Sequence, residues 1–122
     1  ARPNGRELMI GLSRDPIFGP IIAVGLGGIF IEVLKDVSLR LAPVSIDEAM
    51  VMIGELRAAP VLEGARGEPR RDLRALAELV SRVSQLVAAE AASSLHELDL
   101  NPVFVGREGC GVVIGDALLV RR

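Results

Sequence analysis

Oxygen-bearing side chains gather on either side of a glycine-rich turn at 106–111, near the end of the chain. Asp99 and Asn101 stand two residues apart in a run that alternates polar and apolar residues, so on a strand both would project from one face. The turn would fold the following strand back and bring Asp116 opposite them. Two carboxylates and an amide oxygen suit Mg²⁺, which usually takes one or two carboxylates and completes its shell with water and nucleotide phosphates. The same spacing also fits a solvated sheet face that bends after Asn101, and both interpretations stay open at this point.

A cluster of glycines at 25–28 invites comparison with phosphate-binding turns. The dinucleotide fingerprint G-x-G-x-x-G must lead into a helix, but Phe30 stands at its third glycine position and the residues that follow are typical of a strand. The G-K-[ST] ending of a P-loop is missing as well. Two interpretations remain: a tight turn in which glycine supplies a positive φ, or a turn whose backbone N–H groups approach a phosphate.

Other reactive side chains carry weaker signals. His96 beside Glu97 is typical of polar surface, and Cys110 lies among glycines with no basic partner nearby in the sequence. Arg66 lies in a loop, where it would either clamp a phosphate or carboxylate or simply be solvated. The arginines at 70, 71 and 74 are expected on the exposed face of a helix.

Composition excludes several classes of function. The chain has 122 residues with 14 basic and 16 acidic side chains, which argues against an electrostatically driven nucleic-acid binder. Aromatic residues make up only 2%, so a base-stacking platform is not expected. A single cysteine excludes an intramolecular disulfide and a multi-cysteine zinc site. The length fits one domain, and a hydrophobic content of 50% is ample for a core.

The apolar stretch 17–34 is interrupted by glycines and Pro20, so buried strands explain it better than a membrane helix does. No secretory signal pattern is visible at the start. We therefore predict a soluble, cytoplasmic protein.

The elements that must position these residues follow from periodicity. Short apolar, β-branched runs predict strands at 7–13, 21–24 and 29–34. Ser45 and Glu48 form a capping box for a helix that ends at Ala59-Pro60, and Asp72 caps a second helix that fades near 93–94. Strand character returns at 96–105, 112–114 and 117–120. This order predicts an α+β fold, in which two main helices pack on a mostly antiparallel sheet.

Several multi-residue motifs then resemble one known family along nearly the whole chain. They are ELMIG at 7–11, DPIFGP at 15–20, GLGGIFIEVLKD at 25–36, RLAP at 40–43, LEGARG at 62–67, ELDLNP at 97–102 and the pair Asp116-Ala117. In this order they resemble the ATP-grasp domain of the NDP-forming (ADP-forming) acyl-CoA synthetases, to which the succinyl-CoA synthetase β subunit is related.

The resemblance implies that residues 1–122 form a single domain, the C-terminal subdomain of an ATP-grasp, which supplies metal ligands and part of the phosphate site. Asn101 and Asp116 match the positions of Mg²⁺ ligands, while Asp99 stands where relatives often have Glu and is a candidate for cofactor binding. Gly27 and Gly28 match the cofactor-binding glycine pair. Two candidate catalytic residues are Glu32, which would face the nucleotide phosphates, and Arg66 of the loop.

By resemblance, the activity is that of an acid-CoA ligase with Mg²⁺ and ATP or ADP as cofactors. Its chemistry is phosphoryl transfer between the nucleotide and a phosphohistidine on another domain, so His96 is not expected to be that histidine. The lid and CoA-binding domains are expected to lie outside this chain, cut at the hinge before Ala1, and the fragment alone is expected to be inactive. A homo-oligomer is possible in principle, and a non-catalytic regulatory or interaction module with the same fold is the alternative function.

Overall fold

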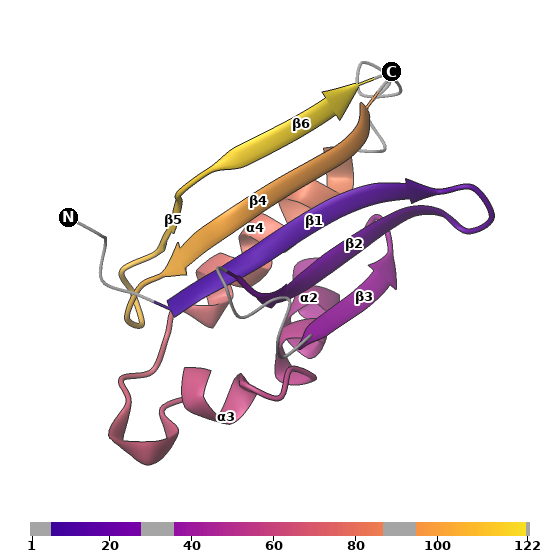
Figure 1. Cartoon of the computed structure of the whole chain (residues 1–122). Coiled ribbons are helices and arrows are strands. Elements are labelled where there is room, and N and C mark those ends of the chain that lie inside the picture. Colours follow the sequence, from indigo (N-terminus) through magenta and orange to yellow (C-terminus); the bar gives the residue numbers. More distant parts are fainter. Residues whose placement is uncertain (1–5, 28–35, 87–94, 122) are drawn as a thin grey trace.

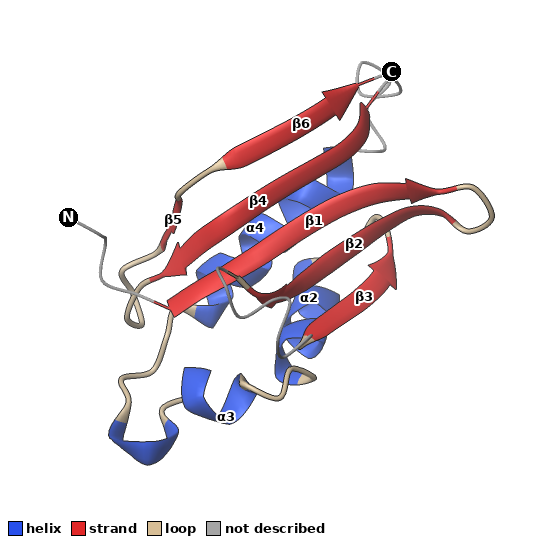
Figure 2. Cartoon of the chain, in the orientation of Figure 1, coloured by secondary structure: helices blue, strands red, loops and turns tan. Residues whose placement is uncertain are grey.

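An antiparallel sheet of six strands carries the two longest described helices on one face (Figures 1 and 2). The computed structural model describes residues 6–27, 36–86 and 95–121. The strand order is β3-β2-β1-β4-β5, and β6 also pairs with β4. The elements are β1 (Arg6–Asp15), β2 (Gly19–Leu26), β3 (Val37–Leu41), α2 (Ile46–Gly54), α3 (Ala59–Leu62), the 3₁₀ helix η1 (Ala65–Gly67), α4 (Leu73–Gln85), β4 (Leu95–Val105), β5 (Val112–Ile114) and β6 (Ala117–Arg121).

The core lies between the sheet and helices α2 and α4. Alternate residues of the central strand β1, namely Leu8, Ile10 and Leu12, point into it and are almost completely buried. The residues between them lie on the opposite face, which no described helix covers (Figure 2). We call this the open face of the sheet.

Both predicted helix caps are confirmed. The Ser45 hydroxyl accepts a hydrogen bond from the Glu48 amide at 3.1 Å, and an Asp72 oxygen accepts one from the Ala75 amide at 3.2 Å. The α+β class, with two main helices on an antiparallel sheet, is confirmed as well.

The predicted end of the first helix is wrong. Helix α2 ends at Gly54, and Pro60 lies in the first turn of a separate short helix, α3, where its missing N–H is not needed. The buried carboxylate of Asp36 fixes the connection, because its two oxygens accept hydrogen bonds from the amides of Arg57 and Ala58 at 2.7 and 2.9 Å.

Strand β3 was not predicted, because its pattern is inverted. Ser38 faces the helices and is buried, whereas Leu39 is exposed on the open face. The Ser38 hydroxyl donates a hydrogen bond to Glu55, the residue that caps the C-terminal end of α2, at 2.8 Å, and Arg40 forms ion pairs with Glu48 and Glu55. Ion pairs thus replace apolar packing between β3 and α2. The predicted strand at 29–34 lies outside the described residues.

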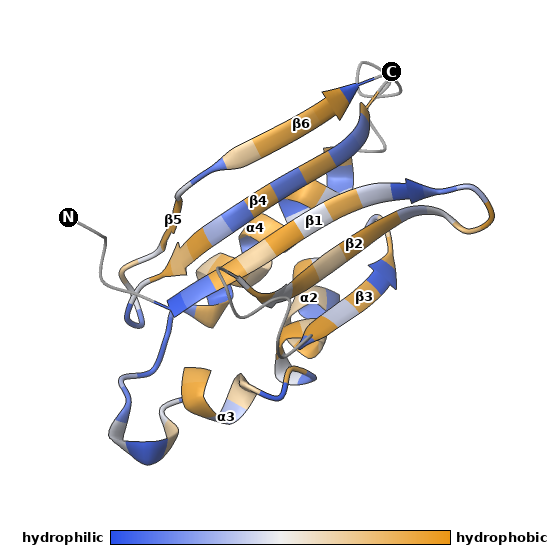
Figure 3. Cartoon of the chain, viewed as in Figure 1, coloured by the Kyte–Doolittle hydropathy of each residue, from blue (hydrophilic) through white to orange (hydrophobic). Residues whose placement is uncertain are grey.

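Colouring by hydropathy shows both hydrophilic and hydrophobic residues along β4 (Figure 3). This agrees with the alternation from which that strand was predicted. Among the described residues, no helix is long and apolar enough to cross a membrane.

Candidate functional site

The junction of β4 with the β5–β6 segment brings the main chains of the two predicted metal ligands together. Leu100 pairs with Ala117, and the Asn101 amide donates a hydrogen bond to the Asp116 carbonyl oxygen at 3.2 Å. Asp116 lies between β5 and β6, where one of its carboxylate oxygens accepts a hydrogen bond from the Ala117 amide at 2.8 Å. The predicted return of the chain, which places Asp116 opposite Asn101, is therefore confirmed.

A bulge in β4 sets the position of Asn101. Leu8 of β1 pairs with Val103 and Ile10 pairs with Leu100, so Asn101 and Pro102 together lie opposite a single residue, Met9. Bulges bend a strand and re-aim its side chains, and proline is tolerated there because the ladder is interrupted. The Asn-Pro pair in the sequence was the available signal for this irregularity.

Gly27 lies against the same junction. A Cβ atom at this position would lie 2.9 Å from the Asn101 Oδ1 and 2.4 Å from the backbone oxygen of Leu8. The glycine cluster and the oxygen cluster, far apart in the sequence, are therefore neighbours. Gly28, the other glycine predicted to bind a cofactor, lies outside the described residues.

The reason for glycine here is close approach of chains. Neither Gly25 nor Gly27 is among the residues with positive φ, so the interpretation as a positive-φ turn is wrong for both. The Gly27 amide donates to the Glu7 carbonyl at 3.0 Å, and the Leu26 amide donates to that of Asp36 at 3.1 Å. Gly27 therefore contributes space beside Asn101 rather than a donor for a phosphate.

Asp99 and His96, both on β4, each have a buried side-chain atom without a described hydrogen-bond partner, and Asp99 is the one beside Asn101. Its Oδ1 is buried and has no hydrogen-bond partner among the described residues. Burial raises the pKa of Asp99 above its ordinary value, and the charges of Glu97 and Asp116 raise it further. A bound cation would relieve both effects.

The oxygen set fits Mg²⁺. An amide and one or two carboxylates are hard oxygen ligands, and the buried Asp99 oxygen without a described partner is an acceptor that a cation or its water would satisfy. Within the described ranges no three acidic, histidine or cysteine side chains cluster closely enough to hold a metal by themselves.

We expect Asp99→Asn to raise the melting temperature at neutral pH when divalent cations are removed. Because the pKa of Asp99 is raised in the fold, the folded state holds its proton more tightly, and stability falls as pH rises through the window above the ordinary value of 3.8. The variant removes this loss and also a negative charge that would attract Mg²⁺. Thermal unfolding between pH 4 and 8, with and without Mg²⁺, measures the pH dependence of stability and the stabilisation by Mg²⁺. A larger Mg²⁺-induced stabilisation in the variant than in the wild type would contradict the assignment.

A shallow hollow of about 250 Å³ adjoins the site on the sheet. Its wall is largely apolar, and Gly11 keeps the surface low because it has no side chain there. Asp99 and Glu97 stand at the β4 side of the hollow. The lining residues are Met9, Gly11, Leu12, Ser13, Ile21, Ala23, Leu39, Glu97, Leu98 and Asp99. Sequence patterns do not reveal this surface, because it is assembled from four strands.

The two predicted catalytic residues are not brought to this junction by the described structure. Glu32 lies outside the described residues. Arg66 is exposed in η1 and does not line the hollow. Its φ is 60°, the only positive value among the non-glycine residues described, and it stands between Gly64 and Gly67, which also have positive φ. Strained backbone of this kind is concentrated at functional positions, so the hypothesis for Arg66 stays open.

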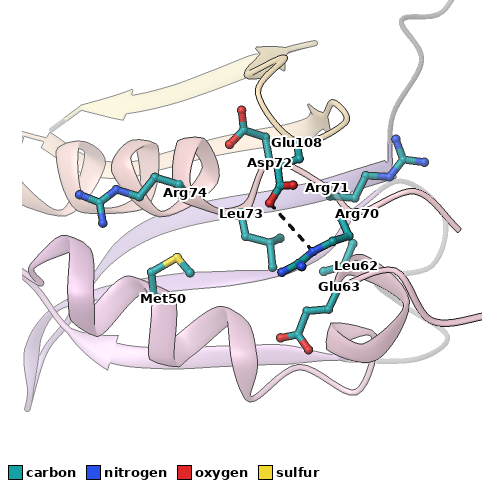
Figure 4. Close-up of a pocket in the computed structure, with 9 residues that line it drawn as sticks. All are labelled: Met50, Leu62, Glu63, Arg70, Arg71, Asp72, Leu73, Arg74 and Glu108. Atoms are coloured by element: carbon teal, nitrogen blue, oxygen red, sulfur yellow. Dashed lines mark ion pairs between the residues drawn. The ribbon is translucent and has the colours of Figure 1, made fainter.

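A second hollow, of about 430 Å³, lies on the helix side and contains none of the predicted site residues (Figure 4). Arg70 and Glu108 face each other across it with 4.0 Å between their charged atoms, while Arg71 and Arg74 point to opposite sides. The placement of Arg70 and Arg71 on a helix is wrong, since α4 begins at Leu73. The Glu108 amide also donates a hydrogen bond to the Arg70 carbonyl oxygen. This bond connects the loop that precedes α4 to the turn between β4 and β5.

Comparison with known sequences identifies the relatives of this chain. A family model described as an ATP-grasp domain matches residues 1–120. The β subunit of ADP-forming acetate–CoA ligase II from Pyrococcus furiosus is 47% identical over 116 residues, which cover 95% of this chain and 49% of that subunit. The ADP-forming acetate–CoA ligase of Methanocaldococcus jannaschii is 45% identical over 115 residues, which cover 94% of this chain but only 16% of that protein. The chain thus spans half or less of the length of these curated relatives.

Solved structures agree with the sequences. PH1788 from Pyrococcus horikoshii superposes with a TM-score of 0.90 at 42% identity, covering 100% of this chain and 51% of that one. Acetyl-coenzyme A synthetase 1 from Candidatus Korarchaeum cryptofilum, in complex with coenzyme A and Mg-AMPPCP, superposes with a TM-score of 0.89 at 41% identity, covering 99% of this chain and 55% of that one. The chain therefore belongs to the ATP-grasp family, among the ATP-grasp domains of the ADP-forming acyl-CoA synthetases.

Proposed function

We propose that this chain forms the metal- and phosphate-binding half of the nucleotide site of an ADP-forming acid–CoA ligase. The observation that carries the proposal is the junction of Asn101 and Asp116 with Gly27, which comes from a distant segment, beside the unsatisfied carboxylate of Asp99. The full-length protein would transfer a phosphoryl group between ATP or ADP and a histidine on another of its domains.

Mg²⁺, when bound, supplies positive charge that neutralises nucleotide phosphates and the charge that develops on the transferred group. The chain's own part is to hold oxygen ligands in place before the nucleotide arrives. Asn101 is fixed by the bulge and by its backbone contact with Asp116, so little reordering is needed on binding. Asp116 provides a charged carboxylate, and Asp99 adds a second one within electrostatic range.

The open face next to this junction is suited to the rest of a nucleotide. The hollow beside Asp99 has apolar walls from Met9, Ala23 and Leu39, which would exclude water from one side of a bound ligand. Arg66 would contact a phosphate or a neighbouring domain. Gly28 and Glu32 remain predicted site residues on the resemblance alone.

The relatives support the choice of ligands. A structure of the Korarchaeum cryptofilum enzyme holds coenzyme A and Mg-AMPPCP, with a phosphohistidine segment pointing towards its nucleotide-binding site. We extend the Mg²⁺–nucleotide to this chain and assign coenzyme A and the phosphohistidine to other parts of the full-length protein. Relatives of similar identity are named acetate–CoA ligase, 4-hydroxybutyrate–CoA ligase and trans-feruloyl-CoA synthase, so the proposal extends to a carboxylic acid and names no particular one.

Nucleotide titration of the full-length protein tests this proposal. We expect Asp116→Asn to weaken the binding of Mg²⁺–ADP at least tenfold, measured by calorimetry, because the variant keeps the shape of the side chain and loses its charge. The matched control is Glu63→Gln, which removes the same charge from an exposed residue at the end of α3 and should change the affinity less than twofold. Equal affinities in the two variants and the wild type would exclude a metal-binding role for Asp116.

The alternative is a regulatory or interaction module that keeps the fold without chemistry. This alternative predicts that acyl-CoA formation does not depend on Asp116, whether or not the chain binds a nucleotide. Full-length protein that forms acyl-CoA only with Asp116 intact decides for the ligase.

A further inference from the structure

The loop that joins β1 and β2 presents two large apolar side chains to solvent. Ile17 is 84% exposed and Phe18 is 66% exposed, the two highest values among the large hydrophobic residues described. The loop projects beyond the end of the sheet, away from the helices (Figure 1). We call Ile17 and Phe18 the apolar tip.

The turn is built by its other residues and does not need an apolar tip. One Asp15 oxygen accepts hydrogen bonds from the Ile17 and Phe18 amides at 2.8 and 2.9 Å, and these bonds hold the pKa of Asp15 below its usual range. Gly19 has a φ of 86°, as a three-residue hairpin loop requires. Polar residues at 17 and 18 would allow the same turn, because only their backbone amides take part in it.

The fixed backbone of the apolar tip favours binding to a partner. Its backbone is already fixed by the Asp15 side chain and by the paired strand residues on either side, so burying it in a partner would lose little conformational entropy. Rigid, protruding aromatic and aliphatic side chains of this kind act as anchors when they fill an apolar pocket.

The tip is separate from the proposed metal site. Ile10 pairs with Leu100, next to Asn101, and Asp15 lies five residues further along β1, or about 17 Å at the usual rise of a strand. A partner that grips the tip would therefore leave Asn101 and Asp116 accessible to a nucleotide.

We propose that the apolar tip docks into an apolar socket on the companion part of the assembled ligase, meaning the subunit or domain outside the segment that matches this chain. This inference rests on the proposed function. The Pyrococcus furiosus relative is a β subunit by name, and in the Methanocaldococcus jannaschii ligase the matching segment is only 16% of the protein, so both provide such a part. A lipid surface fits less well, because two side chains beside the Asp15 carboxylate offer neither a broad apolar face nor excess positive charge.

Site-specific crosslinking in the full-length, fully assembled protein tests the docking. Phe18→p-benzoylphenylalanine should crosslink on irradiation to a residue of the companion part, identified by mass spectrometry of the joined peptides. The matched control is the same replacement at Val51, which is 53% exposed on α2 and should give a yield at least tenfold lower. Equal yields at the two positions, or joining of position 18 to a second copy of this segment or to lipid, would overturn the proposal.

A second variant separates this inference from the proposed function. With Ile17→Ser and Phe18→Ser together, Mg²⁺–ADP affinity should stay within twofold of wild type, while acyl-CoA formation falls at least tenfold because the companion part is misplaced. Unchanged acyl-CoA formation would refute the docking role and leave nucleotide binding intact. Loss of nucleotide binding in the wild type would instead refute the proposed function, whatever the crosslink shows.

Discussion

Asn101→Ala in the full-length protein should lower nucleotide-dependent acyl-CoA formation at least 100-fold, which corresponds to about 2.7 kcal/mol of lost transition-state stabilisation. The variant removes the only neutral oxygen ligand of the proposed set and leaves the carboxylates of Asp99 and Asp116 without it. We expect the backbone contact between Asn101 and Asp116 to survive, because it uses the main chain. Steady-state rates over a range of Mg²⁺ concentrations measure the effect.

The Mg²⁺ series distinguishes a lost ligand from a lost fold. If Asn101 binds the metal, higher Mg²⁺ should restore part of the rate, and the circular dichroism spectrum should match that of the wild type. Wild-type activity at low Mg²⁺ would remove Asn101 from the metal site.

Gly27→Ala should destabilise the fold by about 1–3 kcal/mol, as overpacking does, and lower the melting temperature by about 4–12 °C for a chain of this size. The added Cβ would lie 2.4 Å from the Leu8 carbonyl oxygen and 2.6 Å from its carbon, and both belong to the backbone of a buried strand that cannot swing aside. It would also lie 2.9 Å from the Asn101 Oδ1, so nucleotide binding should weaken together with stability.

Gly54→Ala is the matched control for that prediction. Gly54 is the last residue of α2 and has no atom within 4 Å of its would-be Cβ, and its φ is not among the positive ones. Alanine is the better helix former, so this variant should melt at the wild-type temperature or a few degrees above it. If both variants melt alike, the close approach at Gly27 has no energetic consequence.

The sequence predicted what depends on local rules. Ser45 and Asp72 were recognised as caps because their oxygens act within three residues of the chain. The alternation around Asp99 placed β4 correctly, and the glycine-rich turn brought Asp116 back to it.

The rest depends on contacts between distant segments. Strand β3 hides Ser38 and exposes Leu39 because Glu48 of α2 and the capping residue Glu55 offer polar partners to it, and apolar periodicity does not reveal such pairing between a strand and a helix. The nearness of Gly27 to Asn101 could not be derived from spacing, since 74 positions separate them and the pairing of β1 with both neighbours unites them; the family resemblance alone assigned both to one site.

Among the described strands, β6 pairs only with β4. Asp116, one of the two proposed metal ligands, directly precedes the first residue of β6. A ligand bound by both Asn101 and Asp116 would therefore stabilise the pairing of β6 with β4. The fraction of molecules with a frayed C-terminal strand would decrease as the ligand saturates the junction, because binding to the paired form alone shifts that equilibrium. Ligand binding and the pairing of β6 with β4 would then be thermodynamically linked, so each would favour the other.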